Sequence, residues 1–306
     1  MIVIKGVTVD SNNLTSSIAE PDAAQGEVNW TAGTYTTGTR RVEGVTIYEV
    51  TADPSTSDQP SVGAKKNPAS WVAVAPINKY AMFDGKNTTS TKLSGAGSIV
   101  VNITPNEVTN GLAVFGIKNA TAINVTMTDP VNGQVYNKDI DMVDNSMIST
   151  EWDYCFLPII RIERFILLDL PPYINASTEI TITGTDLEIA NVAIGRQIGL
   201  GEAEHGTGYR LIDTSRQSEN LDGEAITIAG DVSFEVDFNV KIERTQTQAV
   251  TNILQSMRGI PSAWVATERE DVSSDPISVF GTLSDVDITY TDPAISDASF
   301  KIRGFA

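Results

Sequence analysis

The sequence predicts an all-β, multi-domain protein, and three observations favour this fold class. β-Branched residues recur in short runs, as in residues 98–103 and 179–183. Apolar residues occupy every second position of residues 232–242, which is typical of a half-buried strand in an antiparallel sheet. Turn pairs such as Asn132-Gly133 separate these runs, as does Asp222-Gly223 further along the chain.

One helix is expected, over residues 247–257. Its apolar residues recur at helical spacing and form one face: Val250, Ile253, Leu254 and Met257. Thr245 or Thr247 is expected to cap its start. Gly259 follows its end, where a left-handed residue is favoured, and Pro261 prevents continuation.

Composition limits the classes of partner. The 306 residues carry a formal net charge of −18, whereas binding to phosphates needs clustered lysine and arginine, so we expect no nucleic-acid partner. The most apolar stretch, residues 156–170, contains charged residues, so we expect no membrane span. The chain begins with residues that resemble a strand and do not resemble a signal peptide.

The scarce reactive residues favour a protein without a cofactor. Cys155 is the only cysteine, it lies among aromatic residues, and we expect a buried, inert thiol. A zinc site or a serine–histidine triad would depend on His205 alone, and no metal-ligand spacing surrounds it. We therefore expect no catalytic residues, no cofactor and no such metal site, while calcium binding by β loops stays open.

Breaks in composition divide the chain into three expected domains. Residues 1–77 form an N-terminal arm and a small β domain that includes a polar loop over residues 53–70. Residues 78–190 form a β-sandwich that begins after a polar segment. Residues 191–306 form a β domain that contains the expected helix.

The first domain carries a specific spacing of aromatic residues and glycines: Trp30, Tyr35, Gly38, Val42, Gly44, Tyr48 and Trp71. This spacing resembles the small chitin-binding-type carbohydrate modules. The resemblance implies carbohydrate binding by Trp30, Tyr35, Tyr48 and Trp71, because sugar rings pack on exposed aromatic faces. The alternative is that these rings are buried and form the small hydrophobic core of the module, which has too few residues to build a larger core.

The other two domains resemble parts of phage virion proteins. Residues 78–85 resemble a segment that precedes a galactose-binding-type jelly roll, which implies a jelly-roll-like sandwich over residues 78–190. Its aromatic residues Trp152, Tyr154 and Phe165 are expected in the core rather than at a ligand. The glycine-rich residues 195–201 and the end of the chain resemble phage tail-tip proteins, which implies rings joined at sheet edges.

Gly199 and Gly201 superficially resemble a phosphate-binding loop. The segment lacks the following helix and the lysine of such loops, so we interpret these glycines as sites of positive φ or close backbone approach.

Three functions are weighed. The leading prediction is a non-enzymatic structural protein of a phage tail tip, collar or baseplate, located in the virion tail, which forms a homo-oligomer ring with other tail proteins and contacts host glycans. The second is a carbohydrate-binding receptor-recognition protein. The third is a glycan hydrolase that uses Glu151 and Asp153, whose side chains would share one face of a strand about 7 Å apart. A solvated acidic face is favoured over catalysis for this pair.

Overall fold

The structure is a computed structural model that describes residues 1–86, 88–204, 206–213, 215–219, 225–228, 230, 232–266 and 277–305. Strands dominate these residues and helices are few and mostly short, which confirms the predicted all-β class. His205 and the Asp222-Gly223 pair lie outside the described residues.

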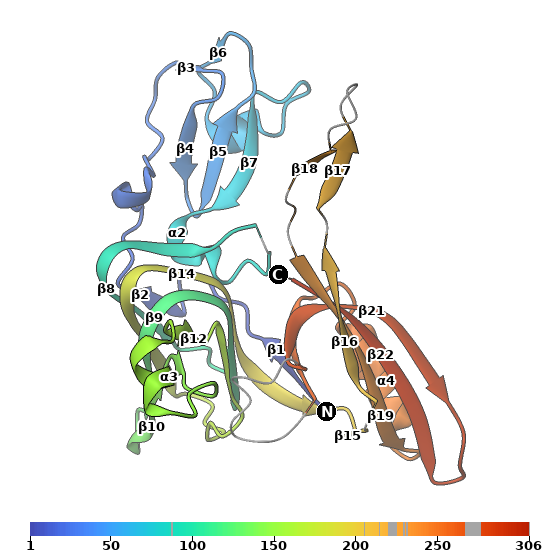
Figure 1. Cartoon of the computed structure of the whole chain (residues 1–306). Coiled ribbons are helices and arrows are strands. Elements are labelled where there is room, and N and C mark those ends of the chain that lie inside the picture. The colour runs from blue at the N-terminus through green and yellow to red at the C-terminus, as the bar shows by residue number, and fades with distance from the viewer. Residues whose placement is uncertain are drawn as a thin grey trace.

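The N-terminal module stands above the rest of the molecule, at the upper left of Figure 1. Strands β4, β5 and β7 form a three-stranded antiparallel sheet, and β3 pairs with β6 beside it. The expected loop over residues 53–70 contains a short strand and a helical turn. The elements before and within the module are β2 (Leu14–Ser16), the 3-10 turn η1 (Ala23–Gln25), β3 (Tyr35–Thr36), β4 (Arg40–Glu43), β5 (Thr46–Val50), β6 (Ser55–Thr56), α1 (Pro60–Gly63) and β7 (Trp71–Pro76).

The middle of the chain forms a lobe around two long, bent strands. The 19-residue β9 pairs with the 23-residue β14, and β8 pairs with the other side of β14. Asn119 and Asp186 adopt positive φ where the register shifts, so both strands bend there. The elements are α2 (Asn78–Ala81), β8 (Thr91–Ile103), β9 (Gly111–Asp129), β10 (Gly133–Asp141), β11 (Val143–Asp144), α3 (Glu151–Phe156), β12 (Ile160–Arg161), β13 (Arg164–Leu167) and β14 (Ser177–Gly199).

Two local predictions for this lobe can be compared with the structure. The Asn132-Gly133 turn is confirmed, since it joins β9 to β10 and Gly133 has a φ of 74°. The described strands pair antiparallel in the order β10-β9-β14-β8. This order by itself does not identify a jelly roll, so that topology stays a prediction.

The C-terminal lobe is a sheet with the order β20-β21-β22-β19-β15, and β16 also pairs with β19. The predicted alternation is confirmed from Val236 onward in β19, because Val236, Phe238, Val240 and Ile242 are buried, whereas Phe234 is half-buried. Strands β17 and β18 extend from this lobe as a hairpin (Figure 1). The elements are β15 (Glu202–Ala203), β16 (Gly208–Asp213), β17 (Arg216–Glu219), β18 (Ala225–Ile228), β19 (Val232–Glu243), α4 (Thr247–Ser256), β20 (Ser262–Val265), β21 (Val279–Thr289) and β22 (Ile295–Gly304).

The predicted helix is confirmed as α4, which packs Val250, Leu254 and Met257 into the core of the C-terminal lobe. The expected threonine cap is wrong. Gln246 is the N-cap residue and makes no side-chain cap hydrogen bond. Gly259 adopts the predicted left-handed conformation, with a φ of 72°.

Strand β1 (Ile2–Gly6) joins the two lobes, because it pairs with β14 on one side and β20 on the other. Its Ile4 is fully buried in a junction core that also contains Phe115 and Phe280. The expected domain limits do not coincide with these pairings. β14 runs without interruption through residues 190 and 191, and the first strand lies beside the last domain instead of within the first.

Candidate functional site

The four predicted carbohydrate-binding residues do not form one exposed platform. Trp71 is completely buried, its Nε1 donates a hydrogen bond of 2.9 Å to the Asp58 carbonyl oxygen, and the Tyr35 ring meets it edge-on at 5.7 Å between centroids. Because Trp71 forms the centre of the module's packing, its assignment as a sugar-contacting ring is wrong. The aromatic spacing at this position reflects the core of a small module.

Tyr35 and Tyr48 are half-buried at the border of this packed centre. Tyr48 lies opposite Arg41 across strands β4 and β5, and the Arg41 guanidinium lies 4.9 Å from the Tyr35 ring centroid. A hydrogen bond with the Thr31 side chain lowers the pKa of the Tyr35 hydroxyl from its ordinary value. The structure thus brings Tyr35, Arg41 and Tyr48 together as a partly exposed aromatic and cationic surface.

Trp30 lies beside strand β4, along the edge that β5 does not occupy. Its backbone N–H donates a hydrogen bond of 2.8 Å to the carbonyl oxygen of Val42, which is buried. Its ring is half-buried, and the indole Nε1 is buried without a hydrogen-bond partner among the described residues. Asn29 forms a parallel bridge with Val42, and neighbouring residues of a strand point to opposite faces, so Trp30 follows on the face of β4 that Arg41 occupies.

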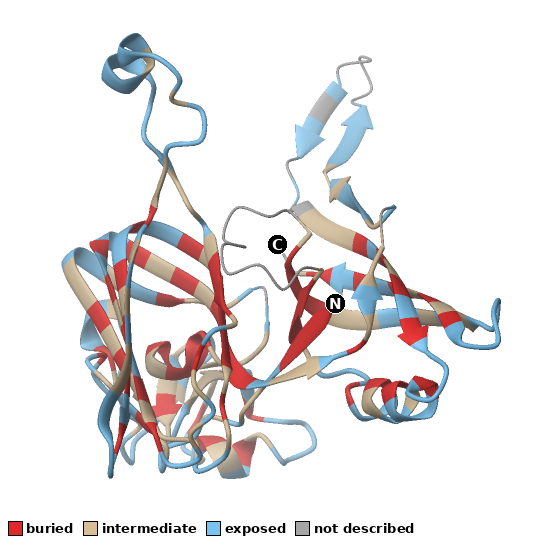
Figure 2. Ribbon diagram, turned by 90° about the horizontal axis from the view of Figure 1, so that it is seen from below, coloured by how far each residue is buried: buried red, intermediate tan, exposed pale blue. Residues whose placement is uncertain are grey.

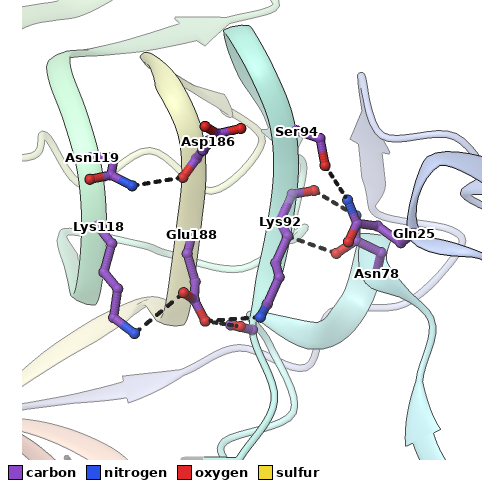
Figure 3. A network of polar contacts seen from close by, with 9 residues as sticks. Gln25, Asn78, Lys92, Ser94, Lys118, Asn119, Asp186 and Glu188 are labelled. Atoms are coloured by element: carbon purple, nitrogen blue, oxygen red, sulfur yellow. Dashed lines mark hydrogen bonds and ion pairs between the residues drawn. The ribbon is translucent and has the colours of Figure 1, made fainter.

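A polar junction fastens the module to the middle lobe (Figure 3). Asn78, at the start of α2, is buried and donates from Nδ2 to Asp22 Oδ2 at 2.7 Å and to the Lys92 carbonyl oxygen at 2.8 Å. Its Oδ1 accepts from the Lys92 backbone N–H at 2.8 Å, and Glu27 accepts from its backbone N–H. Because every polar atom of the Asn78 side chain is used in these contacts, we interpret Asn78 as a structural latch.

Glu188 forms ion pairs with two lysines at this junction. Its carboxylate lies 3.3 Å from both Lys92 Nζ and Lys118 Nζ and accepts a hydrogen bond of 2.6 Å from Ser90, so β8, β9 and β14 meet there (Figure 3). The Ser90 hydrogen bond and the two lysines lower the pKa of Glu188. A cavity of about 600 Å³ adjoins these groups. A carboxyl group held ionised in this way is unsuited to donating a proton as a general acid.

The most unusual surface is an arm, residues 143–161, that extends from the middle lobe. The β11–β12 ribbon leads outward to α3, and Figure 2 shows this helix as a pale blue element that stands off the body. The arm is fixed at its base, where Arg161 donates to the Ala120 carbonyl oxygen at 2.7 Å and Ile162 N–H donates to the Met142 carbonyl oxygen at 3.0 Å. No residue of α3 is buried.

Apolar side chains nevertheless dominate the arm. Trp152, Tyr154 and Phe156 are 69%, 77% and 64% exposed, and the rings of Trp152 and Phe156 lie 4.0 Å apart between centroids. Four aliphatic residues of the arm are exposed as well: Met147, Leu157, Ile159 and Ile160. An apolar surface of this kind marks an interaction site in a folded protein.

The arm overturns several expectations for this part of the chain. Trp152 and Tyr154 are exposed rather than in the core, and only Phe165 is buried as expected. Cys155 is exposed instead of buried. The physical reason is that residues 151–156 form a helix on a projecting ribbon, where packing partners within the described chain are few.

The predicted pair of carboxylates is also corrected. Glu151 and Asp153 belong to α3 and do not lie in a strand, so they do not share a strand face. Asp153 is part of a capping box: it accepts from the Thr150 backbone N–H at 2.9 Å while its own N–H donates to Thr150 Oγ1 at 3.1 Å. Hydrogen bonds from Thr150 and Ser149 lower the pKa of Asp153, which opposes a role as a general acid.

Of the two glycines near the end of β14, only Gly201 has the predicted structural role. Gly201 has a φ of 128°, and a Cβ there would collide with the Lys241 carbonyl oxygen. Gly199 has no atom within 4 Å of the corresponding position. The close approach of β19 therefore explains Gly201.

The sequence contains one signal for the helix of the arm, although the aromatic residues around it suggest a buried segment. A threonine followed three residues later by an acidic residue marks the start of a helix, and Thr150 and Asp153 have this spacing. The exposure of the helix has no comparable signal, because an apolar run looks the same whether its partner lies in the same chain or in another one.

Comparisons with known proteins add no relatives: the chain matches no model of a protein family and no curated protein. Among the described residues, no group of three or more histidine, cysteine or acidic side chains is placed to hold a metal ion. In the same part of the chain, no helix is long and apolar enough to cross a membrane.

Proposed function

We propose that this chain is a structural component of a bacteriophage tail tip, collar or baseplate, and that it works by assembling with other subunits in the virion. The observation that carries the assembly role is the arm with its exposed aromatic residues. The resemblance of residues 78–85 to a segment of phage virion proteins, and of the last third of the chain to phage tail-tip proteins, supports the placement in a tail.

Physical chemistry favours a protein partner for the arm. Exposed aromatic side chains contribute most of the binding energy of many interfaces when a partner buries them. Here Trp152, Tyr154 and Phe156 are presented on a short helix that is capped at its start and fixed at its base. A surface held in place in this way loses little conformational entropy on binding.

The test is the composition of purified phage particles. Antibodies against the chain should label the tail in negative-stain images, and mass spectrometry should detect the chain in washed particles. Particles produced with Trp152→Ser and Phe156→Ser together should lose the chain, whereas Val131→Ser, on an exposed turn, should be incorporated normally. Absence of the wild-type chain from particles would refute the proposal.

A second function, contact with host-surface glycans, is supported by the surface formed by Tyr35, Arg41 and Tyr48. Planar rings bordered by a guanidinium group offer both the apolar face and the hydrogen-bond donor that a sugar requires. A glycan array with the whole chain should show binding that Tyr48→Ala abolishes while the module stays folded. Trp71→Ala serves as the control for unfolding, because it removes a fully buried ring and should cost about 3–5 kcal/mol.

A further inference from the structure

The arm has a pair of exposed aromatic rings on one side of α3 and a concave surface on the other. Trp152 and Phe156 are four residues apart on α3, so they share one face, on which their rings contact each other. A concavity of about 620 Å³ lies on the other side of the helix, between α3 and the ribbon. Neither ring of the Trp152–Phe156 pair lines this arm concavity, whose lining includes Met147, Ile148, Tyr154, Leu157 and Ile159.

We infer that the occupant of the arm is the arm of a second copy of this chain, with the Trp152–Phe156 pair of each copy seated in the arm concavity of the other. This inference deepens the proposed assembly function and rests on it. A twofold contact requires a surface that is complementary to itself, and the arm meets this requirement because its projecting pair and its concavity lie on one short segment.

The available area is sufficient for a stable pair. Aromatic side chains bury roughly 150–250 Å² each, so three rings exposed by about two-thirds or more offer roughly 300–500 Å² per copy. Two copies then provide roughly 600–1,000 Å² from aromatic rings alone. Exposed Met147, Leu157, Ile159 and Ile160 add further apolar area toward the roughly 1,200 Å² at which specific interfaces begin.

The salt dependence of binding distinguishes a second, acidic copy of this chain from a basic protein partner. The arm contains Asp144, Glu151 and Asp153 against a single Arg161, and the whole chain has a net charge of −18. Two copies therefore repel each other, and added salt screens this repulsion while the apolar contact is kept. Pairing of two arms should strengthen as salt increases, whereas binding to a basic protein would weaken.

The test is sedimentation velocity on the full chain at increasing concentration and at low and high salt. We expect a monomer–dimer equilibrium that salt strengthens. Trp152→Ser or Phe156→Ser should weaken the dimer by about thirtyfold or more, as loss of a central interface residue does. Val131→Ser, which removes an 88% exposed apolar side chain outside the arm, should leave the equilibrium unchanged.

Cys155 supplies an independent readout, because it is the only cysteine and is exposed on α3. A short bis-maleimide crosslinker should produce a covalent dimer of the wild-type chain, and the Trp152→Ser variant, which keeps Cys155, should not form it. A monomeric wild-type chain with no crosslinked dimer would overturn the inference. If the double arm variant is still lost from particles in that case, the arm binds another protein and the proposed assembly function stands; if it is incorporated normally, both are refuted.

Discussion

Gly195 in β14 pairs with Gly6 of β1, and its missing side chain leaves room for the β1 backbone. A Cβ at this position would collide with the Lys5 carbonyl oxygen, whereas Gly199, four residues later in the same strand, has open space around it. The two glycines therefore differ in what they contribute: Gly195 allows the close approach of β1, whereas Gly199 lies in open space.

Gly195→Ala should destabilise the protein by about 3 kcal/mol, because either β1 or β14 must move to make room for the methyl group. Gly199→Ala should be neutral or stabilise by up to about 1 kcal/mol, since alanine restricts the unfolded chain more than glycine does. Urea unfolding of the two variants checks this difference. Equal losses in both would show that the contact between β1 and β14 is looser than described.

The contribution of Glu188 to stability, at the junction of β8, β9 and β14, should depend on pH. The Ser90 hydrogen bond, with Lys118 and Lys92, lowers the pKa of this carboxyl group in the folded state. Its contribution to stability should thus be complete above the ordinary pKa of a glutamate and should disappear as the pH falls through the lowered value. The stability difference between wild type and Glu188→Gln in urea unfolding should accordingly shrink in acid.

Ser90→Ala provides the control for this prediction, because it removes the largest cause of the lowered pKa and keeps both lysines. In that variant the loss of stability in acid should be smaller than in the wild type and should be complete at a higher pH, because the pKa of Glu188 in the folded state lies closer to its ordinary value. An unchanged pH profile in both variants would mean that Glu188 is solvated rather than paired.

At the scale of elements, the periodicity of apolar residues predicts those strands and helices that bury one face in the same chain. The alternation over residues 232–242 and the apolar spacing of residues 247–257 identify β19 and α4, because both elements bury one face in the same chain. The aromatic residues of α3 follow no such rule. They are exposed because α3 projects from the body of the protein, and no local pattern distinguishes them from core residues.

The arm should be dispensable for folding. Replacing residues 145–158 by a short Gly-Ser linker should change the unfolding free energy of the rest by less than about 0.5 kcal/mol, because α3 buries no residue and the anchoring Met142 is kept. Urea unfolding measures this directly. A large loss of stability would indicate that the arm packs on its own body in solution.

At the scale of the whole molecule, one strand couples the two lobes. The sequence indicates that the chain begins with a strand, but the partners of this strand are far away in the chain: Ile2 pairs with Gly199 in β14 and with Val265 in β20. Such distant pairings leave no trace in local composition. For the same reason the expected domain boundary between residues 190 and 191 falls inside a continuous strand, β14.

Ile4→Ala should weaken both lobes together by about 2–5 kcal/mol, because Ile4 is fully buried in the core that β1 shares with Ala193 and Val265. Hydrogen exchange should then rise in β14 and in β20. Ile302→Ala, in the core of the C-terminal lobe alone, is the comparison and should raise exchange mainly in that lobe. If Ile4→Ala affects one lobe only, the two lobes unfold independently.

The account depends most on the arm as a contact between subunits. Cryo-electron microscopy of purified phage particles, in which we propose that the chain resides, tests this contact directly. The account predicts several copies around the tail, each with Trp152 and Phe156 buried against a neighbouring subunit. A tail in which the chain is present and its arm projects into solvent would contradict it.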